Sequence, residues 1–467
     1  MSRWTDDQVL AALELALPVD RRNGGGAGAP LYSSVSTDTR TLEEGALFVA
    51  LRGENFDGHA FLGKARAQGA RGAVVDRVPD DAPPLRYYLV PDTLTALGRL
   101  GRHRRRQVDG RVVAITGTNG KTTTKEMARA VLATRYVTHA TAANLNNLVG
   151  APLTLLAAPD DAGAMVVEIG MNVPGEIARL AEIVEPEIAV VTAVAEGHLE
   201  GIGTVEGVLR EKTSLLSRTQ RGGLAIVAEE PHALPERARS LARRVRVVGW
   251  TDRADPDFRA DHLRIDEDGR VRFDWQGRHV SLPFGGRVHA RNALIALAIG
   301  AEWGVDPDEA VAALATIEAP GMRGETYRYG DLVVVADCYN ANPASLAASL
   351  DTLVAMPRRG GRVAVVGSML ELGARSEALH REAAARVAGA DVDLVVAVGL
   401  FEPAFEPLRE AMGDRLITVP DTAAAVEPLL HRLRGDEVVL LKGSRGVALE
   451  ELMPRLEERF GEPGEVG

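Results

Sequence analysis

Residues 111–125 constrain the fold more than any other stretch of the chain. The apolar run RVVAITG (111–117) leads through a glycine-bearing turn to KTTTK (121–125), which begins a helical pattern. An apolar strand followed by a tight turn and a helix is typical of parallel sheets that helices cover on both faces. The alternation continues through AMVVEIG (164–170) and EIAVVTAV (187–194). We therefore expect an α/β protein whose central sheet is doubly wound and mostly parallel.

Two further α/β units flank this central one. In the N-terminal unit, strand signals at 46–53 and 71–77 enclose a helical spacing at 58–70. The C-terminal unit alternates apolar strands with helices and is Rossmann-like, although its first strand is not followed by G-x-G-x-x-G. At roughly 150 residues per domain, the 467 residues agree with three domains. The predicted boundaries are 1–108, 109–321 and 322–467.

Local patterns refine the connections between these units. VRFDWQGRHVSLPFGG (271–286) alternates apolar and polar residues around turn residues and predicts hairpins. HARNALIALAIGAEWG (289–304) predicts a helix, and EAPGMRGE (318–325) a break. RNGGGAGAP (22–30) predicts a flexible loop. The basic cluster 102–106 ends a predicted helix, and we interpret it as a solvated helix end rather than a phosphate patch.

Composition excludes several classes of protein. Acidic residues outnumber basic ones 65 to 54, for a net charge of -11, which disfavours a nucleic-acid binder. No apolar run reaches the ~18 residues of a membrane span, and the N-terminus lacks a signal-peptide pattern. Cys338 is the single cysteine, so it forms no internal disulfide, and we interpret it as a packed small residue. These features predict a cytoplasmic protein without membrane insertion, and we expect a monomer.

Lysine is rare in this chain. Of 54 basic residues only five are lysine, namely Lys64, Lys121, Lys125, Lys212 and Lys442. Arginine supplies almost all of the solvated positive charge. Lysine differs chemically because it is a compact charge whose amine can be deprotonated and modified. Lysines kept in an arginine-rich chain are therefore candidates for positions where arginine would fail.

The turn after the first central strand has the residues of a nucleotide loop. Its glycines let backbone N–H groups face phosphate oxygens, Lys121 reaches the outer phosphates, and Thr122 offers a hydroxyl to Mg²⁺. The pattern G-x-x-x-x-G-K-[ST] is complete except for Ile115 at its first position. The predicted nucleotide-binding residues are Gly117, Thr118, Asn119, Gly120, Lys121, Thr122 and Thr123.

Three residues later in the chain are further candidates for this nucleotide site. Glu168 ends a central strand at the edge where ligands bind in such sheets, so it is a candidate Mg²⁺ ligand; a cap of the next helix is the alternative. His198 follows the next strand, and a lone histidine is more often structural. Lys212 lies on a predicted amphipathic helix beside Arg210, where a merely solvated charge would be arginine.

A series of ordered motifs resembles the Mur ligases of peptidoglycan synthesis. The motifs are TGTNGKTT, TAANLNN (141–147), VEIGMN (167–172), EGHLEGIG (196–203), REKTSLL (210–216), HARNA (289–293), GMRGE (321–325), DCYNANP (337–343) and KGSRG (442–446). YNANP, MLELG (369–373), STDTR (36–40) and GENFDGH are similar to members that add D-alanyl-D-alanine to UDP-N-acetylmuramoyl-tripeptide. Ser368, Ala336 and Cys338 depart from the family pattern in the third domain, which concerns the dipeptide contacts.

The resemblance implies roles for individual residues. Lys212 matches a lysine that CO₂ carbamylates; with His198 it would hold one Mg²⁺, while Thr122 and Glu168 hold a second. Asn144 would contact the γ-phosphate of ATP. The remaining implied contacts are Asn292, Arg323 and Asp337 with adenine, phosphate and ribose; Ser36, Asp38, Thr39 and Arg40 with the UDP end of the substrate; and Asn340, Asn342 and Lys442 with the amino substrate.

The implied activity is an ATP-dependent amide-bond ligation through an acyl phosphate, with the third domain closing on ATP. Another ligase with the same ATP and lysine sites, folylpolyglutamate synthase or the tripeptide-forming Mur enzyme, is an alternative. The STDTR segment and the additional N-terminal domain disfavour the folate enzyme. A nucleotide switch that uses the loop without ligation is a further alternative, and it would not require Lys212.

Overall fold

The computed structural model describes residues 4–16, 19–20, 31–53, 56–197, 199–266, 269–318, 321–357 and 360–464. The loop predicted at 22–30 and the candidate ligand His198 lie outside the described residues. The chain divides into two compact units, each built from several segments. Unit 1 comprises 1–115, 135–189 and 214–224, and unit 2 comprises 116–134, 190–213 and 225–467.

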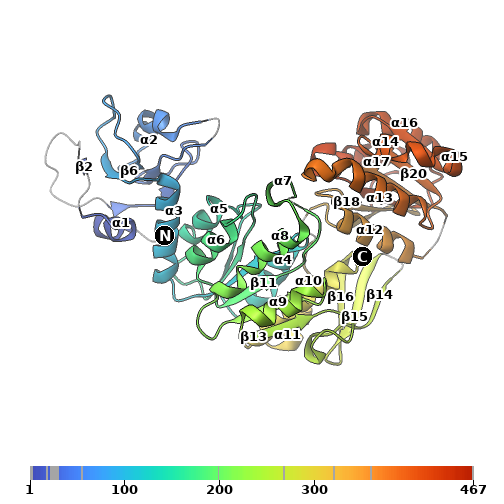
Figure 1. Cartoon of the computed structure of the whole chain (residues 1–467), viewed down its shortest axis with the longest axis horizontal. Helices are drawn as coiled ribbons and strands as arrows, with labels where there is room; N and C mark the ends of the chain where they lie inside the picture. Colours follow the sequence, from blue (N-terminus) through green and yellow to red (C-terminus); the bar gives the residue numbers. More distant parts are fainter. Residues whose placement is uncertain are drawn as a thin grey trace. The chain divides into compact units, whose positions relative to one another are not determined.

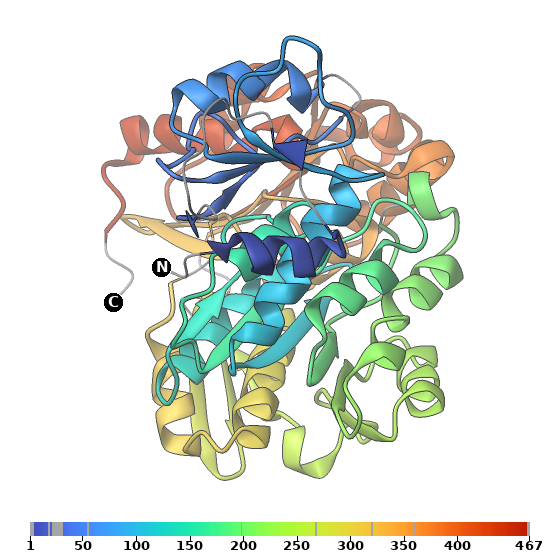
Figure 2. The same cartoon turned by 90° about the vertical axis from the view of Figure 1, so that its left-hand side faces the viewer.

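The N-terminal part of unit 1 is a five-stranded sheet in the order β2-β7-β6-β5-β4. Its strands are β2 (Val19–Asp20), β7 (Arg86–Leu89), β6 (Gly72–Val75), β5 (Leu47–Val49) and β4 (Val35–Ser36). The pairs are parallel except β2 with β7. The helix expected at 58–70 is a 3-10 turn, η1 (Gly58–Phe61), followed by α2 (Leu62–Ala67). Helices α1 (Asp6–Leu13) and α3 (Thr93–Gln107) pack against each other (Figure 2).

The predicted central sheet has six strands in the order β13-β12-β11-β8-β10-β9. They are β13 (Arg244–Val248), β12 (Leu224–Ala228), β11 (Ile188–Val191), β8 (Arg111–Thr116), β10 (Ala164–Glu168) and β9 (Thr138–Ala140). Buried β-branched residues fill β8 and β10, as expected for strands covered on both faces. These two strands pair in parallel with Glu168 opposite Ile115, so Glu168 ends its strand at the level where the nucleotide loop begins.

Unit 2 contains the predicted hairpins and the C-terminal sheet. Strands β14 (Asp261–Ile265), β15 (Arg270–Trp275) and β16 (Arg278–Gly285) form an antiparallel sheet. The following helix α10 (Val288–Glu302) is buried over most of its length and packs on α4 (Lys121–Ala133). The C-terminal sheet, shown in orange and red in Figure 1, has the order β17-β18-β22-β19-β20-β21. It comprises β17 (Glu325–Tyr329), β18 (Leu332–Asp337), β22 (Val438–Lys442), β19 (Arg362–Gly367), β20 (Leu394–Val398) and β21 (Leu416–Val419).

The C-terminal unit, predicted to be Rossmann-like, is confirmed as a mostly parallel sheet with helices between its strands. Its strands run parallel except β17, which pairs antiparallel with β18. Helices α12 (Pro343–Ala355) and α13 (Ser376–Ala388) follow β18 and β19. In such a sheet the loops after the strands meet at one edge, which is where ligands bind. The loops after β18 and β22 carry the YNANP and KGSRG motifs.

The arginine cluster at 102–106 ends a helix as predicted, but the prediction of a solvated end is wrong for two of its members. Arg104 and Arg105 are 2% and 7% exposed. Arg104 Nη2 donates to the Ala158 carbonyl at 2.6 Å, and Arg105 Nε to the Val184 carbonyl at 3.3 Å. Carbonyls at helix ends lack intrahelical partners, so these guanidinium groups complete α5 (Gly150–Leu156) and α6 (Glu176–Val184). The cluster joins the helices of unit 1.

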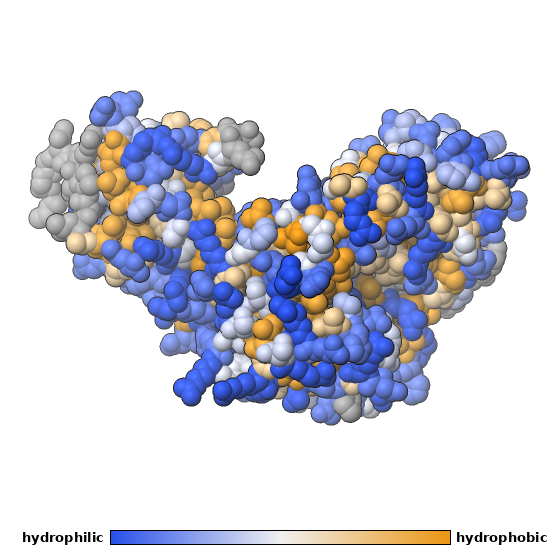
Figure 3. Space-filling view, viewed as in Figure 1, coloured by the Kyte–Doolittle hydropathy of each residue, from blue (hydrophilic) through white to orange (hydrophobic). Residues whose placement is uncertain are grey.

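On the face shown in Figure 3, apolar side chains gather in separate patches among hydrophilic ones. Within the described ranges, no helix has the length and hydropathy needed to cross a membrane.

Replacing Arg105 tests this role of the cluster. Arg105→Ala removes a buried donor from the end of α6, and we expect a loss of about 2–3 kcal/mol in unfolding free energy. Arg106→Ala is the matched control, because Arg106 is exposed and only pairs with Glu185; we expect about 1 kcal/mol or less. Urea unfolding midpoints measure both. Equal effects of the two substitutions would contradict the assignment.

Candidate active site

A side chain at the end of the neighbouring strand β11 holds the nucleotide loop closed. Thr192 Oγ1, just after β11, donates to the Asn119 carbonyl at 2.6 Å. A Cβ at Gly117 would lie 1.9 Å from the same oxygen, so only glycine fits there. Lys121, the first residue of α4, donates from Nζ to the Gly117 carbonyl at 2.9 Å. The loop therefore has a fixed shape with its lysine folded over it.

Thr118 and Thr123 are buried, and Thr122 is half-buried in the first turn of α4. The Thr118 amide donates to the Ala193 carbonyl at 2.9 Å, which ties the loop to the segment after β11 a second time. The loop leads directly into the N-terminus of α4, which begins at Lys121. Unpaired N–H groups at a helix N-terminus attract anions, so the geometry suits a phosphate chain.

A buried amide from α10 lies against the loop. Asn292 is fully buried, and its Oδ1 would lie 2.7 Å from a Cβ at Gly120. Asn292 Nδ2 is 3.3 Å from His289 Nδ1. Asn292 Oδ1 is buried, yet within the described ranges it has no hydrogen-bond partner. A buried acceptor without a donor is costly in a protein alone, so this oxygen is suited to a ligand N–H or O–H.

Burial decides the charge state of His289. Desolvation lowers its pKa to about 4, and Asp337 opposes this effect only in part. The ring is therefore neutral near pH 7. It stands edge-on to Phe284 with ring centroids 4.9 Å apart. A neutral ring has one bare nitrogen, so Nδ1 can accept from the Asn292 amide and fix its orientation.

Lys212 is the most unusual cation of the site. It lies on α8 (Val205–Thr213) and is fully buried, and no described residue forms a hydrogen bond with its Nζ. Desolvation lowers the pKa of this amine well below its ordinary value, and the positive charge of Lys121 acts in the same direction. A lowered pKa favours the neutral form of the amine, whose lone pair can attack a small electrophile.

Glu168 belongs to unit 1, with Asn146 and Thr141 around it. Asn146 Nδ2 donates to Glu168 Oε1 at 2.8 Å, and the Glu168 amide donates to Thr141 Oγ1 at 2.9 Å. Glu168 is 1% exposed, and its Oε2 forms no hydrogen bond with any residue that the structure describes. A buried carboxylate with one free oxygen is suited to a cation. Asn144, from the same loop as Asn146, is exposed.

At the edge of the C-terminal sheet, Lys442 organises the loop after β18. It is 2% exposed, and its Nζ donates to Asp337 Oδ2 at 2.8 Å and to the Asn340 carbonyl at 2.9 Å. The Arg323 guanidinium stacks over the Tyr339 ring, 3.9 Å from its centroid. Cys338 is fully buried, and burial raises the pKa of its thiol to about 12, consistent with a packed residue.

The STDTR segment of unit 1 forms a compact turn. Ser36 Oγ accepts from the Asp38 amide at 3.2 Å, and Thr39 is buried. Asp38 makes a bidentate ion pair with Arg40, with Nη2 to Oδ2 at 2.6 Å. The hydrogen bonds from the Arg40 side chain and backbone lower the pKa of Asp38 to about 2. The exposed Arg40 guanidinium is thus held in place, as a binding residue requires.

Unit 2 brings together the nucleotide loop, Asn292 and the loop after β18, which sequence motifs had predicted separately. Three contributors had no predicted role, namely Thr192, Asn146 and His289. Asn146 and His289 belong to motifs, and Thr192 lies in a predicted strand, but the sequence gives no sign of the side chain or carbonyl that each one contacts. Across the described ranges, no three His, Cys, Asp or Glu side chains form a metal-binding cluster.

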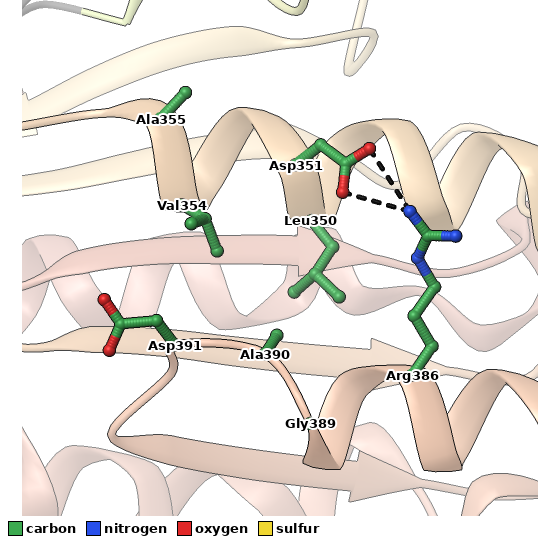
Figure 4. Close-up of a pocket in the computed structure, with 8 residues that line it drawn as sticks. All are labelled: Leu350, Asp351, Val354, Ala355, Arg386, Gly389, Ala390 and Asp391. Atoms are coloured by element: carbon green, nitrogen blue, oxygen red, sulfur yellow. Dashed lines mark hydrogen bonds and ion pairs between the residues drawn. The ribbon is translucent and has the colours of Figure 1, made fainter.

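A hollow on the C-terminal sheet's helices does not belong to this site. Its volume is about 400 Å³, and it lies between α12 and the end of α13 (Figure 4). Arg386 Nη2 bonds both Asp351 oxygens at 3.1 and 3.2 Å across it. None of the predicted site residues lines it.

Fold and site together define an α/β nucleotide-binding protein, and comparisons with known proteins identify its family. Residues 31–105 match the Mur ligase family catalytic domain, 115–300 the Mur ligase middle domain and 322–445 the Mur ligase glutamate ligase domain. The chain belongs to the Mur ligase family.

Particular relatives match over nearly the whole chain. The UDP-N-acetylmuramoyl-tripeptide--D-alanyl-D-alanine ligase of Escherichia coli (strain K12) is 37% identical over 462 residues, covering 96% of this chain and 99% of the relative. The crystal structure of MurF from Acinetobacter baumannii has a TM-score of 0.87 at 30% identity, covering 98% and 99% of the two chains. The MurF ligase of Thermotoga maritima, in complex with ADP, has a TM-score of 0.81 at 27% identity, covering 91% and 97%.

The titration of His289 makes the stability of the protein depend on pH. In the unfolded chain a histidine binds a proton below about pH 6.5, whereas the buried native ring does so only near pH 4. Between these values the unfolded state holds more protons, so stability rises with pH and is lost as pH falls from about 6.5 to 4. The loss can reach ~3 kcal/mol.

Unfolding free energies measured between pH 4.5 and 7.5 check this. We expect a shallower pH dependence for His289→Gln than for the natural protein. His431→Gln, which removes an exposed histidine of α16 (Thr422–Arg432), is the control and should leave the slope unchanged. Parallel curves for His289→Gln and the natural protein would show that the ring is not neutral in the folded state.

Proposed function

We propose that this protein is an ATP-dependent ligase that joins D-alanyl-D-alanine to UDP-N-acetylmuramoyl-tripeptide and forms the UDP-linked pentapeptide of peptidoglycan synthesis. The observation that carries the proposal is the match to the Escherichia coli ligase over 96% of the chain. It includes the N-terminal and C-terminal regions as well as the nucleotide loop. The site supports it, because the loop lies in one unit with the C-terminal loop 337–342 and with Lys212, a buried amine whose pKa is lowered.

The reaction needs two displacements. The terminal carboxylate of the tripeptide attacks the γ-phosphorus of ATP, which gives an acyl phosphate and ADP. The dipeptide amine then attacks the acyl carbon, loses a proton, and expels phosphate from the tetrahedral intermediate. Lys121 and the N-terminus of α4 would neutralise the transferring phosphoryl group, so catalysis is mainly positioning and electrostatics. Asn292, Arg323 and Asp337 would bind the nucleoside and phosphate parts of ATP, with Asn144 at the γ-phosphate.

The chemistry of the donors fits Mg²⁺. Glu168 offers a buried carboxylate oxygen without a partner, and Thr122 offers a hydroxyl at the start of α4. These two would hold one ion, and His198 with a modified Lys212 a second. Bound Mg²⁺ supplies positive charge to the phosphate oxygens in the transition state. The residues described here would hold and orient the triphosphate around it.

We infer that Lys212 acts as a carbamate. The neutral amine attacks CO₂, a new N–C bond forms, and a proton leaves, so an uncharged group becomes an anionic oxygen ligand. The buried, unpartnered Nζ with a lowered pKa is the state from which this reaction proceeds. Arginine could not replace it, which agrees with the retention of lysine at this position.

The other proposals concern the ends of the chain. Ser36, Asp38, Thr39 and Arg40 would bind the UDP end of the substrate, and Asn340, Asn342 and Lys442 would position the dipeptide. The division at 108/109 and 321/322 assigns these tasks to separate domains, of which the third closes on ATP. A cytoplasmic location is supported by the buried free thiol and the use of ATP.

The ligation assay tests the function directly. Purified protein with Mg-ATP and UDP-N-acetylmuramoyl-tripeptide should release phosphate in proportion to added D-alanyl-D-alanine, and mass spectrometry should find the pentapeptide. Turnover with a single amino acid on a shorter acceptor would instead indicate another ligase of the family. Phosphate release that ignores every amine would indicate a nucleotide switch.

The carbamate has its own test. Lys212→Ala should lower the rate at least about 100-fold, because a metal ligand is lost, and a short-chain carboxylic acid should restore part of it. With ¹³CO₂, NMR should detect a carbamate carbon in the natural protein that is absent from Lys212→Ala. Lys64→Ala, which removes an exposed lysine of α2, is the control. The same ¹³C signal in both lysine variants would rule the carbamate out at Lys212.

A further inference from the structure

Two asparagines from motifs 223 residues apart form a reciprocal amide pair. Asn342 Nδ2 donates to Asn119 Oδ1 at 2.7 Å, and Asn119 Nδ2 donates to Asn342 Oδ1 at 3.2 Å. Asn119 belongs to the nucleotide loop. Asn342 lies in the loop between β18 of the C-terminal sheet and α12. A primary amide offers a donor and an acceptor side by side, so two amides can satisfy each other without charge. Asn342 is 4% exposed, which keeps water from competing for these bonds.

The same side chain also starts α12. Asn342 Oδ1 accepts from the Ser345 amide at 2.9 Å, and Ser345 Oγ accepts from the Asn342 amide at 3.0 Å. This is a capping box, with Pro343 in the first helical turn. The helix start and the nucleotide loop are therefore held by one residue.

Each asparagine is anchored from behind. The Asn119 carbonyl accepts a hydrogen bond from Thr192, which holds the loop against the end of β11. On the other side Lys442 holds the Asn340 carbonyl and the Asp337 carboxylate together. The amide pair thus links the nucleotide loop to the ends of β18 and β22. Neither end of the link can shift without breaking one of these part-buried hydrogen bonds.

We propose that Asn342 is a positioning residue for amide-bond formation, which it serves by binding Asn119. This inference rests on the proposed function. An acyl phosphate would form beside the nucleotide loop, and an amine reacts with it only when the two groups are held about 3–3.5 Å apart. The amide pair holds the loop after β18, where the amino substrate would bind, at a constant distance from the loop that would hold the phosphates. It acts on the second step rather than on nucleotide binding.

Serine variants separate this role from the cap. Asn342→Ser keeps a capping side chain but is too short for the amide pair, and Asn119→Ser removes the other half. We expect kcat/KM for D-alanyl-D-alanine to fall about tenfold in each variant, the effect of losing one to two hydrogen bonds. In Asn342→Ser, which leaves the nucleotide loop itself intact, the affinity for ADP should change less than about threefold. The double variant should be no worse than either single one, because the same contact is already lost.

Losses that multiply in the double variant would overturn the proposal, as would an unchanged kcat/KM in Asn342→Ser. A reduced affinity for ADP equal to the loss in kcat/KM would also overturn it, because the contact would then serve nucleotide binding alone.

Hydrogen exchange gives a test that does not depend on ligation. In the natural protein with ADP, the first-turn amides of α12, including Ser345, should exchange slowly. In Asn119→Ser they should exchange about tenfold faster, although residue 119 lies in another motif. Asn172→Ser, at an exposed asparagine, is the control. Unchanged exchange in Asn119→Ser overturns the coupling, whereas changed exchange in a protein that makes no pentapeptide would refute the proposed function and leave the contact standing.

Discussion

The close approach of Thr192 to Gly117 is the contact on which the rest of the site depends. The threonine oxygen occupies the space that any side chain at 117 would need, and it bonds the carbonyl of Asn119. The loop is thereby held between the ends of β8 and β11 rather than left free to adapt. A rigid loop can present its amides, Lys121 and the α4 terminus to a phosphate chain with little loss of conformational entropy on binding.

Buried cations give the site its second constraint. Lys125, Lys212 and Lys442 are each 2% exposed or less, while Lys121 is half-buried and only Lys64 is exposed. Lys125 pairs with Glu126, and Lys442 with Asp337. Lys212 differs because none of the described residues gives its amine such a partner, so burial lowers the pKa of the amine and favours its uncharged form. Burial therefore has different chemical results for these lysines. A lysine with a carboxylate partner forms an ion pair, whereas a lysine without one becomes a candidate nucleophile.

Sequence reasoning predicted more of the fold than of the contacts. The strands at 111–117 and 164–170, the hairpins at 271–286 and the helix at 289–304 were predictable because burial imposes a period on the sequence. The prediction of a solvated end at 102–106 was wrong for Arg104 and Arg105. Charge alone does not reveal that their side chains bond carbonyls at the ends of other helices. A pattern of residues reports exposure only on average.

The sequence by itself determined the class of architecture, the position of the nucleotide loop and the choice of lysine at 212, because these depend on local backbone needs and on the chemistry of single residues. Only the tertiary structure decided that Asn119 meets Asn342, that Asn292 lies against Gly120, and that Lys442 holds the loop after β18. Each of these contacts joins segments far apart in the chain. Their geometry depends on how whole elements pack, which no local period encodes.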